Sequence, residues 1–325
     1  KTTAGQYVYQ ISRDDLPQQL NEIAIIYFEI NELIKDLQSD HDYVKSFRRV
    51  YNEYFIFEDK KIIAKPTSEI KSDSLNSPDD TEATFSAKYG RRNIGYSTHI
   101  SETINPENKI NLITDIVTVK NNVTDDRIHA ARIPELKKKT PPLNEYFADG
   151  AYVNEQIDIL NKEHNITQYQ TGVKGRKSAA NVRIKIDGED YTVTCAGGQT
   201  IVAKIADKSY KVVFDPEICK NCPLIALCKL YLEGSKNEEK RRCYYFGMKN
   251  ILAHERIQNI EKLPMARRNT RSNVEATVKE LKRGMQNGKV RVRQWIRISL
   301  HMVFTAISVN LRRIHLKTNG EYSFL

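Results

Sequence analysis

Apolar residues recur at helical spacing near the start of the chain. From Leu16 to Leu37 they follow one another at alternating intervals of four and three, the pattern of a helix that packs against another helix. A second apolar series runs from Tyr43 to Phe57, after a turn-like polar segment at 39–42. We predict a helical hairpin over residues 1–64, acidic on its outside, that serves either as a structural arm or as a dimerisation surface.

Two strands are predicted in the next part of the chain. Residues 65–93 are polar and rich in turn signals, which indicates a linker or loop segment. The runs IGYSTHISETI and INLITDIVTV then alternate in polarity and are separated by a turn segment at 105–109. We expect an antiparallel hairpin that opens the first part of an α/β core over residues 94–170.

A strand, helix, strand unit follows in LNEYFADGAYVNEQIDILNKEH and the apolar run Ile166–Tyr169. Its first strand ends at Asp149. Ligands bind at the carboxyl ends of strands in open α/β sheets, so Asp149 is a candidate for chemistry. An aspartate at a strand end is also an ordinary turn or N-cap residue, and this alternative stays open.

Hairpin signals and cysteines mark residues 171–266, which we interpret as a β-rich insertion. Asp187-Gly188 lies between two alternating arms, and four cysteines lie around the hairpins. A C-x2-C pair with further thiols nearby favours a structural zinc site with four thiolate ligands. Unligated thiols, or Cys243 as the fourth ligand, are the alternatives. The predicted zinc ligands are Cys195, Cys219, Cys222 and Cys228.

Residues 267–325 are predicted to form C-terminal helices that complete the core. One helical stripe runs from Trp295 through Met302 to Val309, and we interpret it as core packing. The longest apolar run, Ile296 to Val309, is interrupted by charge and is shorter than the roughly 20 residues that cross a bilayer. We expect a cytoplasmic protein, of which this chain is a part.

The distribution of charge indicates a polyanionic partner. The net charge is +10 and the pI is about 9.2. Residues 14–60 hold eleven acids and five bases, whereas residues 262–297 hold eleven bases and only two acids, Glu275 and Glu280. Lysine and arginine gain binding free energy when they displace counterions from phosphates, so a nucleic acid should prefer the C-terminal part. A basic protein without such a partner is the alternative.

Several motifs, in their order along the chain, resemble the DDE transposases of bacterial insertion sequences. The resemblance extends from about Ser77 to Ile314 and includes the GYSTHI and INLITDIVTV hairpin, FADGAY, the cysteine-bearing insertion and RSNVEATVKELK. It implies an RNase H-like mixed sheet with helices. The family's Y-x2-R-x3-E-x6-K signature matches Arg271, Glu275 and Lys282, but Arg268 stands at the tyrosine position.

The resemblance implies a catalytic role for Asp149 and Glu275, as the second and third acids of the triad. The first acid, with its core strand, is expected upstream of the chain, and Asp79, Asp80 and Asp115 are possible substitutes. Glu280 lies about 140° away from Glu275 around a helix, so both cannot face one site, and we expect it to be a surface charge. The predicted DNA contacts are Arg271, Lys282, Arg267, Arg268, Arg283, Arg291 and Arg293.

The function implied is DNA strand cleavage and transfer by phosphoryl transfer. Two Mg²⁺ or Mn²⁺ ions would be bound by Asp149 and Glu275, because carboxylates are the oxygen ligands that such ions accept. The partners would be the element ends and target DNA, with the protein a homo-oligomer on DNA near the bacterial nucleoid. Two alternatives are a catalytically incomplete DNA-binding regulator derived from a transposase, and a zinc-ribbon nucleic-acid binder without catalytic ancestry.

Overall fold

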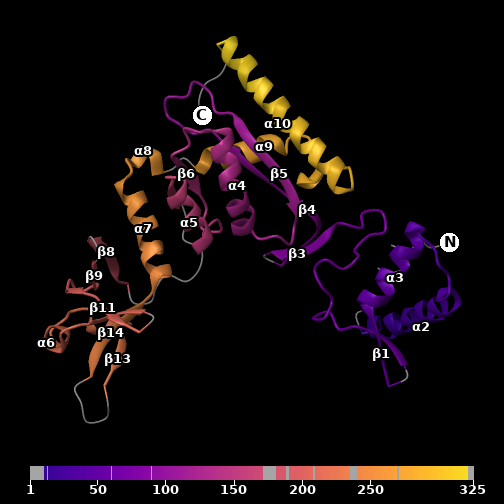
Figure 1. Ribbon diagram of the computed structural model, residues 1–325, viewed down its shortest axis with the longest axis horizontal. Coiled ribbons are helices and arrows are strands. Elements are labelled where there is room, and N and C mark those ends of the chain that lie inside the picture. Colours follow the sequence, from indigo (N-terminus) through magenta and orange to yellow (C-terminus); the bar gives the residue numbers. More distant parts are fainter. Residues whose placement is uncertain are drawn as a thin grey trace. The chain divides into compact units, whose positions relative to one another are not determined.

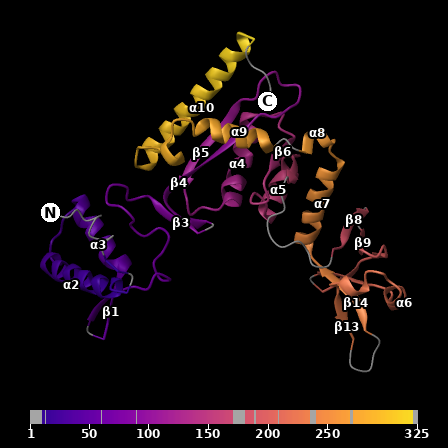
Figure 2. The ribbon, with the colours of Figure 1, turned by 180° about the vertical axis from the view of Figure 1, so that it is seen from behind.

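The computed structural model describes residues 11–320, except 13, 60, 89, 171–180, 188–189, 208, 235–239 and 269–270. The protein is of mixed α/β class with several small sheets (Figures 1 and 2). It divides into two compact units, one formed by Lys1–Thr124 with Val278–Leu325 and the other by Asp125–Thr277. The first unit therefore combines both ends of the chain.

The described part of the first unit contains two helices and a two-stranded sheet near its start, a three-stranded sheet in its middle and a long C-terminal helix. In chain order its elements are α2 (Leu16–Ile34), α3 (Asp42–Tyr54), β1 (Phe55–Glu58), β2 (Lys61–Ala64), β3 (Thr84–Lys88), β4 (Arg91–Glu102), β5 (Ile113–Lys120), the 3-10 turn η2 (Gln286–Gly288) and α10 (Trp295–Thr318).

The two predicted N-terminal helices are present and pack against each other. The rings of Tyr27 in α2 and Phe47 in α3 are stacked with their centroids 5.0 Å apart. The prediction that the second helix continues to Phe57 was wrong, because residues 55–58 form β1, which pairs antiparallel with β2. Aromatic and β-branched residues in this stretch favour a pleated, half-buried surface over a further helical turn.

The predicted hairpin at 94–119 is confirmed as β4 and β5, which pair antiparallel. Strand β3 lies on the other side of β4, although residues 84–88 fall in the segment expected to be a linker. Figures 1 and 2 both show α10 running along β5. The amide of Asn310 in α10 holds the start of β5 by accepting from the backbone N–H of Ile113 and donating to its carbonyl, both at 2.9 Å.

The predicted core stripe of α10 is confirmed only in part. Met302 and Val309 are buried, and Val309 contacts Ile113 and Ala306 in a small core. Trp295 remains 42% exposed, with its indole N–H donating to the carbonyl of Thr118 at 2.8 Å. The rest of the helix leaves large apolar side chains in solvent.

A buried arginine connects four segments of the first unit. The side chain of Arg313 in α10 is 7% exposed and pairs with Glu102 at the end of β4, at 3.5 Å, and with Glu280, at 2.8 Å. It also donates to the carbonyl of Asn111 at 2.9 Å. Arg312 binds Glu280 from the more exposed side of α10. The prediction of Glu280 as a surface charge was therefore wrong, since its side chain is only 15% exposed and pairs with both Arg312 and Arg313.

Replacing Glu280 by Gln should remove a pH-dependent part of the stability. Burial alone would raise the pKa of Glu280, but the hydrogen bonds from Arg312 and Arg313 outweigh it and lower this pKa below its ordinary value. A carboxylate with a lowered folded-state pKa stabilises the protein above its unfolded pKa, and this stabilisation is lost as the pH falls through the folded pKa. Urea unfolding of the wild type and Glu280→Gln should therefore differ at about pH 6 and converge towards about pH 3. A difference that does not change with pH would contradict this expectation.

The second unit is built around a short parallel strand pair and a β-rich part, by which we mean residues 183–246. Its elements are α4 (Asp125–Lys139), β6 (Glu145–Ala148), α5 (Glu155–Glu163), β7 (Thr167–Gln170), β8 (Arg183–Asp187), β9 (Asp190–Thr194), β10 (Thr200–Val202), β11 (Lys204–Ala206), β12 (Ser209–Val213), α6 (Pro216–Lys220), the 3-10 turn η1 (Ile225–Leu227), β13 (Tyr231–Glu233), β14 (Arg241–Phe246), α7 (Met248–Lys262), α8 (Met265–Arg268) and α9 (Arg271–Leu281), whose last residues belong to the first unit.

The predicted strand, helix, strand unit is confirmed. Strands β6 and β7 pair in parallel, and α5 connects them. Their core joins Ile133 of α4, Ile157 of α5 and Ile166, all buried. The carboxylate of Asp158 in α5 accepts a hydrogen bond from Arg256 in α7 at 2.7 Å, with both side chains nearly buried, so α7 is fixed to the same unit.

The β-rich part contains the hairpin predicted at Asp187-Gly188. Asp187 pairs with Asp190 where β8 meets β9, while Gly188 lies outside the described residues. The sheets follow the orders β10-β9-β8 and β11-β12-β14-β13. Phe214, Val193 and Ile251 lie in their shared core. Residues 248–262 form α7, so the segment 171–266 is not β-structure throughout. None of the described helices combines the length and the apolar character needed to cross a membrane.

Candidate active site

Asp149 is the first residue after β6, at the carboxyl end of the parallel pair. Its Oδ1 accepts a hydrogen bond from the backbone N–H of Ala151 at 2.6 Å, and its carbonyl accepts one from Tyr152 at 3.0 Å. The side chain is half-buried. Asp149 therefore performs the turn-forming role that the sequence left open, at the place where ligands bind to such sheets.

A network of amides fixes the turn that follows Asp149. Gln168 in β7 donates to the carbonyl of Tyr152 at 2.8 Å, and Asn161 in α5 donates to Gln168 and to the hydroxyl of Tyr146. Asn161 and Gln168 are buried. Connected and buried hydrogen bonds of this kind favour one backbone geometry, so the position of Asp149 is well defined.

These supporting residues could not be predicted from the sequence. Their positions carry no chemistry that a motif would mark, and a polar residue within an apolar pattern does not reveal its partner. The ring of His129 in α4 also meets Tyr146 and Tyr152 edge-on, with centroids 4.7 and 5.6 Å away. Only the tertiary fold brings this ring and the two amides to the Asp149 turn.

Glu275 lies on α9 in the same unit as Asp149, and its side chain is exposed. The helix buries Thr277 and Leu281 on another side. Two residues along a helix correspond to a rotation of about 200°, which turns Glu275 away from the side that packs through Thr277. The convergence of Asp149 and Glu275 on one ion stays a prediction.

Arg267 is engaged within the protein. Its guanidinium pairs with Glu145 in β6 and lies over the ring of Phe147, 5.6 Å from the ring centroid. Its side chain is 26% exposed. The contact fixes α8 to β6, so DNA binding by Arg267 would compete with a structural ion pair.

Arg268 and Arg293 also have partners within the protein. The Nε of Arg268 donates to the carbonyl of Leu263 at 2.9 Å, near the C-terminal end of α7. Arg293 donates to the carboxylate of Asp79 at 2.6 Å, with both side chains largely exposed. An exposed pair of this kind is weak, so Arg293 can exchange its partner for a phosphate.

Three other predicted DNA contacts have exposed side chains. They are Lys282, Arg283 and Arg291, in the first unit. Arg271 begins α9, and its side chain lies outside the described part of the structure. DNA binding by these residues stays a prediction.

The three substitutes for the first acid differ in their surroundings. Asp79 pairs with Arg293, and Asp80 is buried and accepts from the hydroxyl of Tyr96, at 2.7 Å, and the backbone N–H of Gln294, at 2.8 Å. Asp115 is buried within β5. Asp80 is thus a structural residue that holds the start of α10, since both of its carboxylate oxygens are used.

The four cysteines predicted to bind zinc line one pocket, but they do not form a closed metal site in this conformation. Within the described residues, no three or more His, Cys, Asp or Glu side chains are grouped closely enough to hold a metal ion. Cys243 does not line the pocket; it is buried in β14, and its thiol donates to Glu233 at 3.1 Å. Burial, followed by the hydrogen bond to Glu233, raises the pKa of Cys243 to about 11.

Residues 194–315 match the protein family described as Transposase DDE domain. This part of the chain therefore carries a transposase DDE domain, and the resemblance found in the sequence is confirmed over it. The family implies polynucleotidyl transfer, use of a divalent metal and DNA binding. The matched range includes Glu275 and the cysteines but not Asp149. No curated protein and no solved structure matches the chain.

Proposed function

We propose that this chain is the catalytic region of an insertion-sequence transposase, which cuts DNA and joins the new end to a target. The observation that carries the proposal is the match of residues 194–315 to the Transposase DDE domain. The position of Asp149 at a strand end, in the same unit as Glu275, supports it. The family implies an RNase H-like core, and the described candidate strands are the sheet β3-β4-β5 in one unit and the parallel pair β6-β7 in the other.

Asp149 and Glu275 are the proposed metal-binding acids. Their carboxylates are the hard oxygen ligands that Mg²⁺ and Mn²⁺ accept, and neither side chain is fully buried. Asp149 holds its carboxylate in place through the Ala151 contact, while Glu275 brings the second carboxylate from a helix. Bound Mg²⁺ would supply Lewis-acid stabilisation of the attacking and leaving oxygens of the phosphodiester.

The first acid of the triad is not assigned within this chain. Asp80 is unsuited because its carboxylate is buried and holds Tyr96 and the start of α10. Asp79 is exposed in a turn segment and pairs with Arg293.

The exposed bases near α9 are the proposed phosphate contacts. Lys282, Arg283 and Arg291 project charge into solvent, and Arg271 precedes Glu275 by one helical turn. Basic side chains that contact phosphates offset the repulsion between catalytic carboxylates and the DNA backbone. The protein would act as a homo-oligomer bound to the element ends.

Strand cleavage by the complete protein tests the proposal. Labelled DNA carrying the element ends is incubated with the protein in Mg²⁺, in Mn²⁺, or with EDTA. We expect cleavage with either ion and none with EDTA, because each ion supplies the Lewis acid. DNA binding without cleavage in Mg²⁺ and Mn²⁺ would contradict the proposal and favour a DNA-binding derivative that lacks catalysis.

A further inference from the structure

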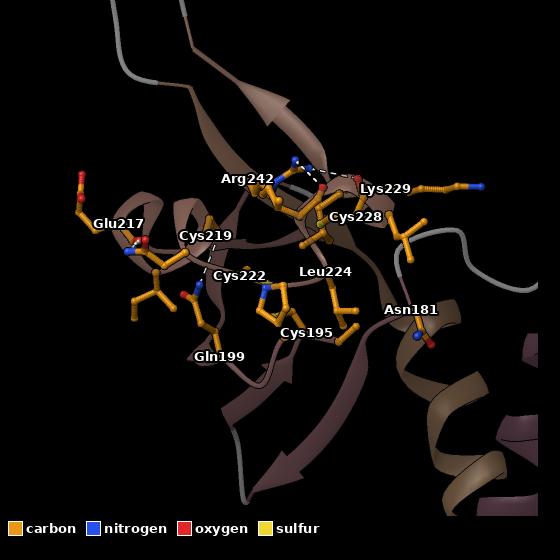
Figure 3. Close-up of a pocket in the computed structure, with 18 residues that line it drawn as sticks. Asn181, Cys195, Gln199, Glu217, Cys219, Cys222, Leu224, Cys228, Lys229 and Arg242 are labelled. Atoms are coloured by element: carbon orange, nitrogen blue, oxygen red, sulfur yellow. Dashed lines mark hydrogen bonds between the residues drawn. The ribbon is translucent and has the colours of Figure 1, made fainter.

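Four cysteines from separate segments of the β-rich part line a single pocket. Figure 3 shows Cys195, Cys219, Cys222 and Cys228 around one pocket. The volume of this pocket is about 590 Å³. Cys195 comes from the turn after β9, Cys219 from α6, and Cys222 from the residues just after α6. Cys228 follows η1. The fold thus concentrates four of the five cysteines of the chain in one place.

A glycine turn allows the first cysteine to approach the third. The carbonyl of Cys195 accepts from the N–H of Gly198 at 3.0 Å, and Gly198 has a φ of +90°, which side chains disfavour. A Cβ on Gly197 would lie 2.7 Å from the sulfur of Cys222 and 3.7 Å from that of Cys195. Both sulfurs therefore lie near one point, and only glycine leaves this space open.

A second turn presents the C-x2-C pair to the same pocket. The N–H of Cys222 donates to the carbonyl of Cys219 at 3.2 Å. Cys219 and Cys222 thus line the same pocket as Cys195 and Cys228.

Two polar side chains brace the cysteine segments. The side-chain amide of Gln199 donates to the sulfur of Cys219 at 3.4 Å, and its Oε1 accepts from the backbone N–H of Asp215 at 3.0 Å, so Gln199 links the first segment to the second. Arg242 donates to the backbone carbonyl of Cys228 at 3.2 Å. Partners that orient ligands in this way are a regular feature of metal sites.

We infer that Cys195, Cys219, Cys222 and Cys228 form a structural zinc site in the β-rich part. Because the described residues hold no closed metal site, zinc binding would draw the four sulfurs closer together. Four thiolates leave no position for a reacting group, which makes the site structural. The small sheets around the core at Phe214 and Val193 gain a cross-link between three segments. This inference does not rest on the proposed catalytic function.

Metal analysis of the complete protein tests the inference. Protein purified in the presence of zinc is dialysed, and its metal content is measured for the wild type and for Cys222→Ser. We expect about one zinc per wild-type chain, and a content at least about tenfold lower in Cys222→Ser. Cys243→Ser is the matched control, because it removes a cysteine outside the pocket, and it should keep the zinc.

Cobalt substitution keeps the test valid if Cys222→Ser fails to fold. Co²⁺ added to the metal-free wild-type protein should give the strong visible and near-ultraviolet absorption of tetrahedral thiolate coordination, and Zn²⁺ should abolish it. Wild-type protein that binds neither ion, binds iron instead, or forms disulfides among these cysteines would overturn the inference. Equal zinc in Cys222→Ser and Cys243→Ser would overturn it as well. Strand cleavage is not the readout, so failure of the catalytic proposal would be seen separately.

Discussion

Asp149→Asn should reduce metal-dependent strand cleavage about a thousandfold, which corresponds to roughly 4 kcal/mol of transition-state stabilisation. Asn keeps the oxygen that accepts from the N–H of Ala151, so the turn after β6 should persist. It removes the negative charge that a divalent ion requires. The substitution therefore separates the turn-forming role of Asp149 from its proposed metal-binding role.

Glu275→Gln should cause a loss of similar size, because it removes the other proposed carboxylate. Glu155→Gln is the matched control: Glu155 is exposed in the first turn of α5, in the same unit, and its loss changes the net charge equally. Rates of end cleavage in Mg²⁺ are compared with circular dichroism spectra of each variant. Wild-type cleavage rates in Asp149→Asn and Glu275→Gln would contradict the proposed metal-binding role of both carboxylates. Asp149 would then only form a turn, and Glu275 would only be a surface charge.

Arg313→Met should destabilise the protein by about 3–5 kcal/mol, the cost of leaving buried charges without their partner. The substitution keeps much of the apolar volume of the side chain but leaves Glu102, which is 3% exposed, without its arginine. The carbonyl of Asn111 loses a donor as well. The free energy of unfolding, measured by urea titration near neutral pH, should show this loss.

Arg312→Met provides the control for this result. Arg312 pairs with the same carboxylate, Glu280, but its side chain is 44% exposed. Exposed ion pairs contribute at most about 1 kcal/mol, so Arg312→Met should be nearly neutral. Equal losses in the two arginine variants would show that burial does not determine the strength of these pairs.

Local patterns predicted the elements around the candidate site better than their boundaries. Alternation and turn residues identified the hairpin of β4 and β5. They also identified the strand, helix, strand unit whose first strand is followed by Asp149. The helix expected to reach Phe57 ended earlier, because the pairing of β1 with β2 overrides helical spacing. Strand pairing between segments is decided by tertiary contacts, which a periodic pattern does not record.

Polar contacts between distant parts of the chain could not be predicted from the sequence. Glu280 was assigned to the surface from its angle on α9, whereas Arg312 and Arg313 bury it from the last helix. The gathering of cysteines was foreseen from their spacing, but not the bracing by Gln199 and Arg242. An ion pair or amide contact depends on where two distant elements meet, and charge patterns along one helix carry no such information.

The hydrogen bond between Arg256 in α7 and Gln170 at the end of β7, 3.2 Å long, brings the exit of the β-rich part back to its entry. A module attached through two adjacent points can be lengthened, shortened or replaced with little change to the strands that carry it. The hydrogen bond at Gln170 therefore holds the two ends of the β-rich part together beside the strand pair of β6 and β7, so we expect changes in the length of that part to leave the geometry around Asp149 intact.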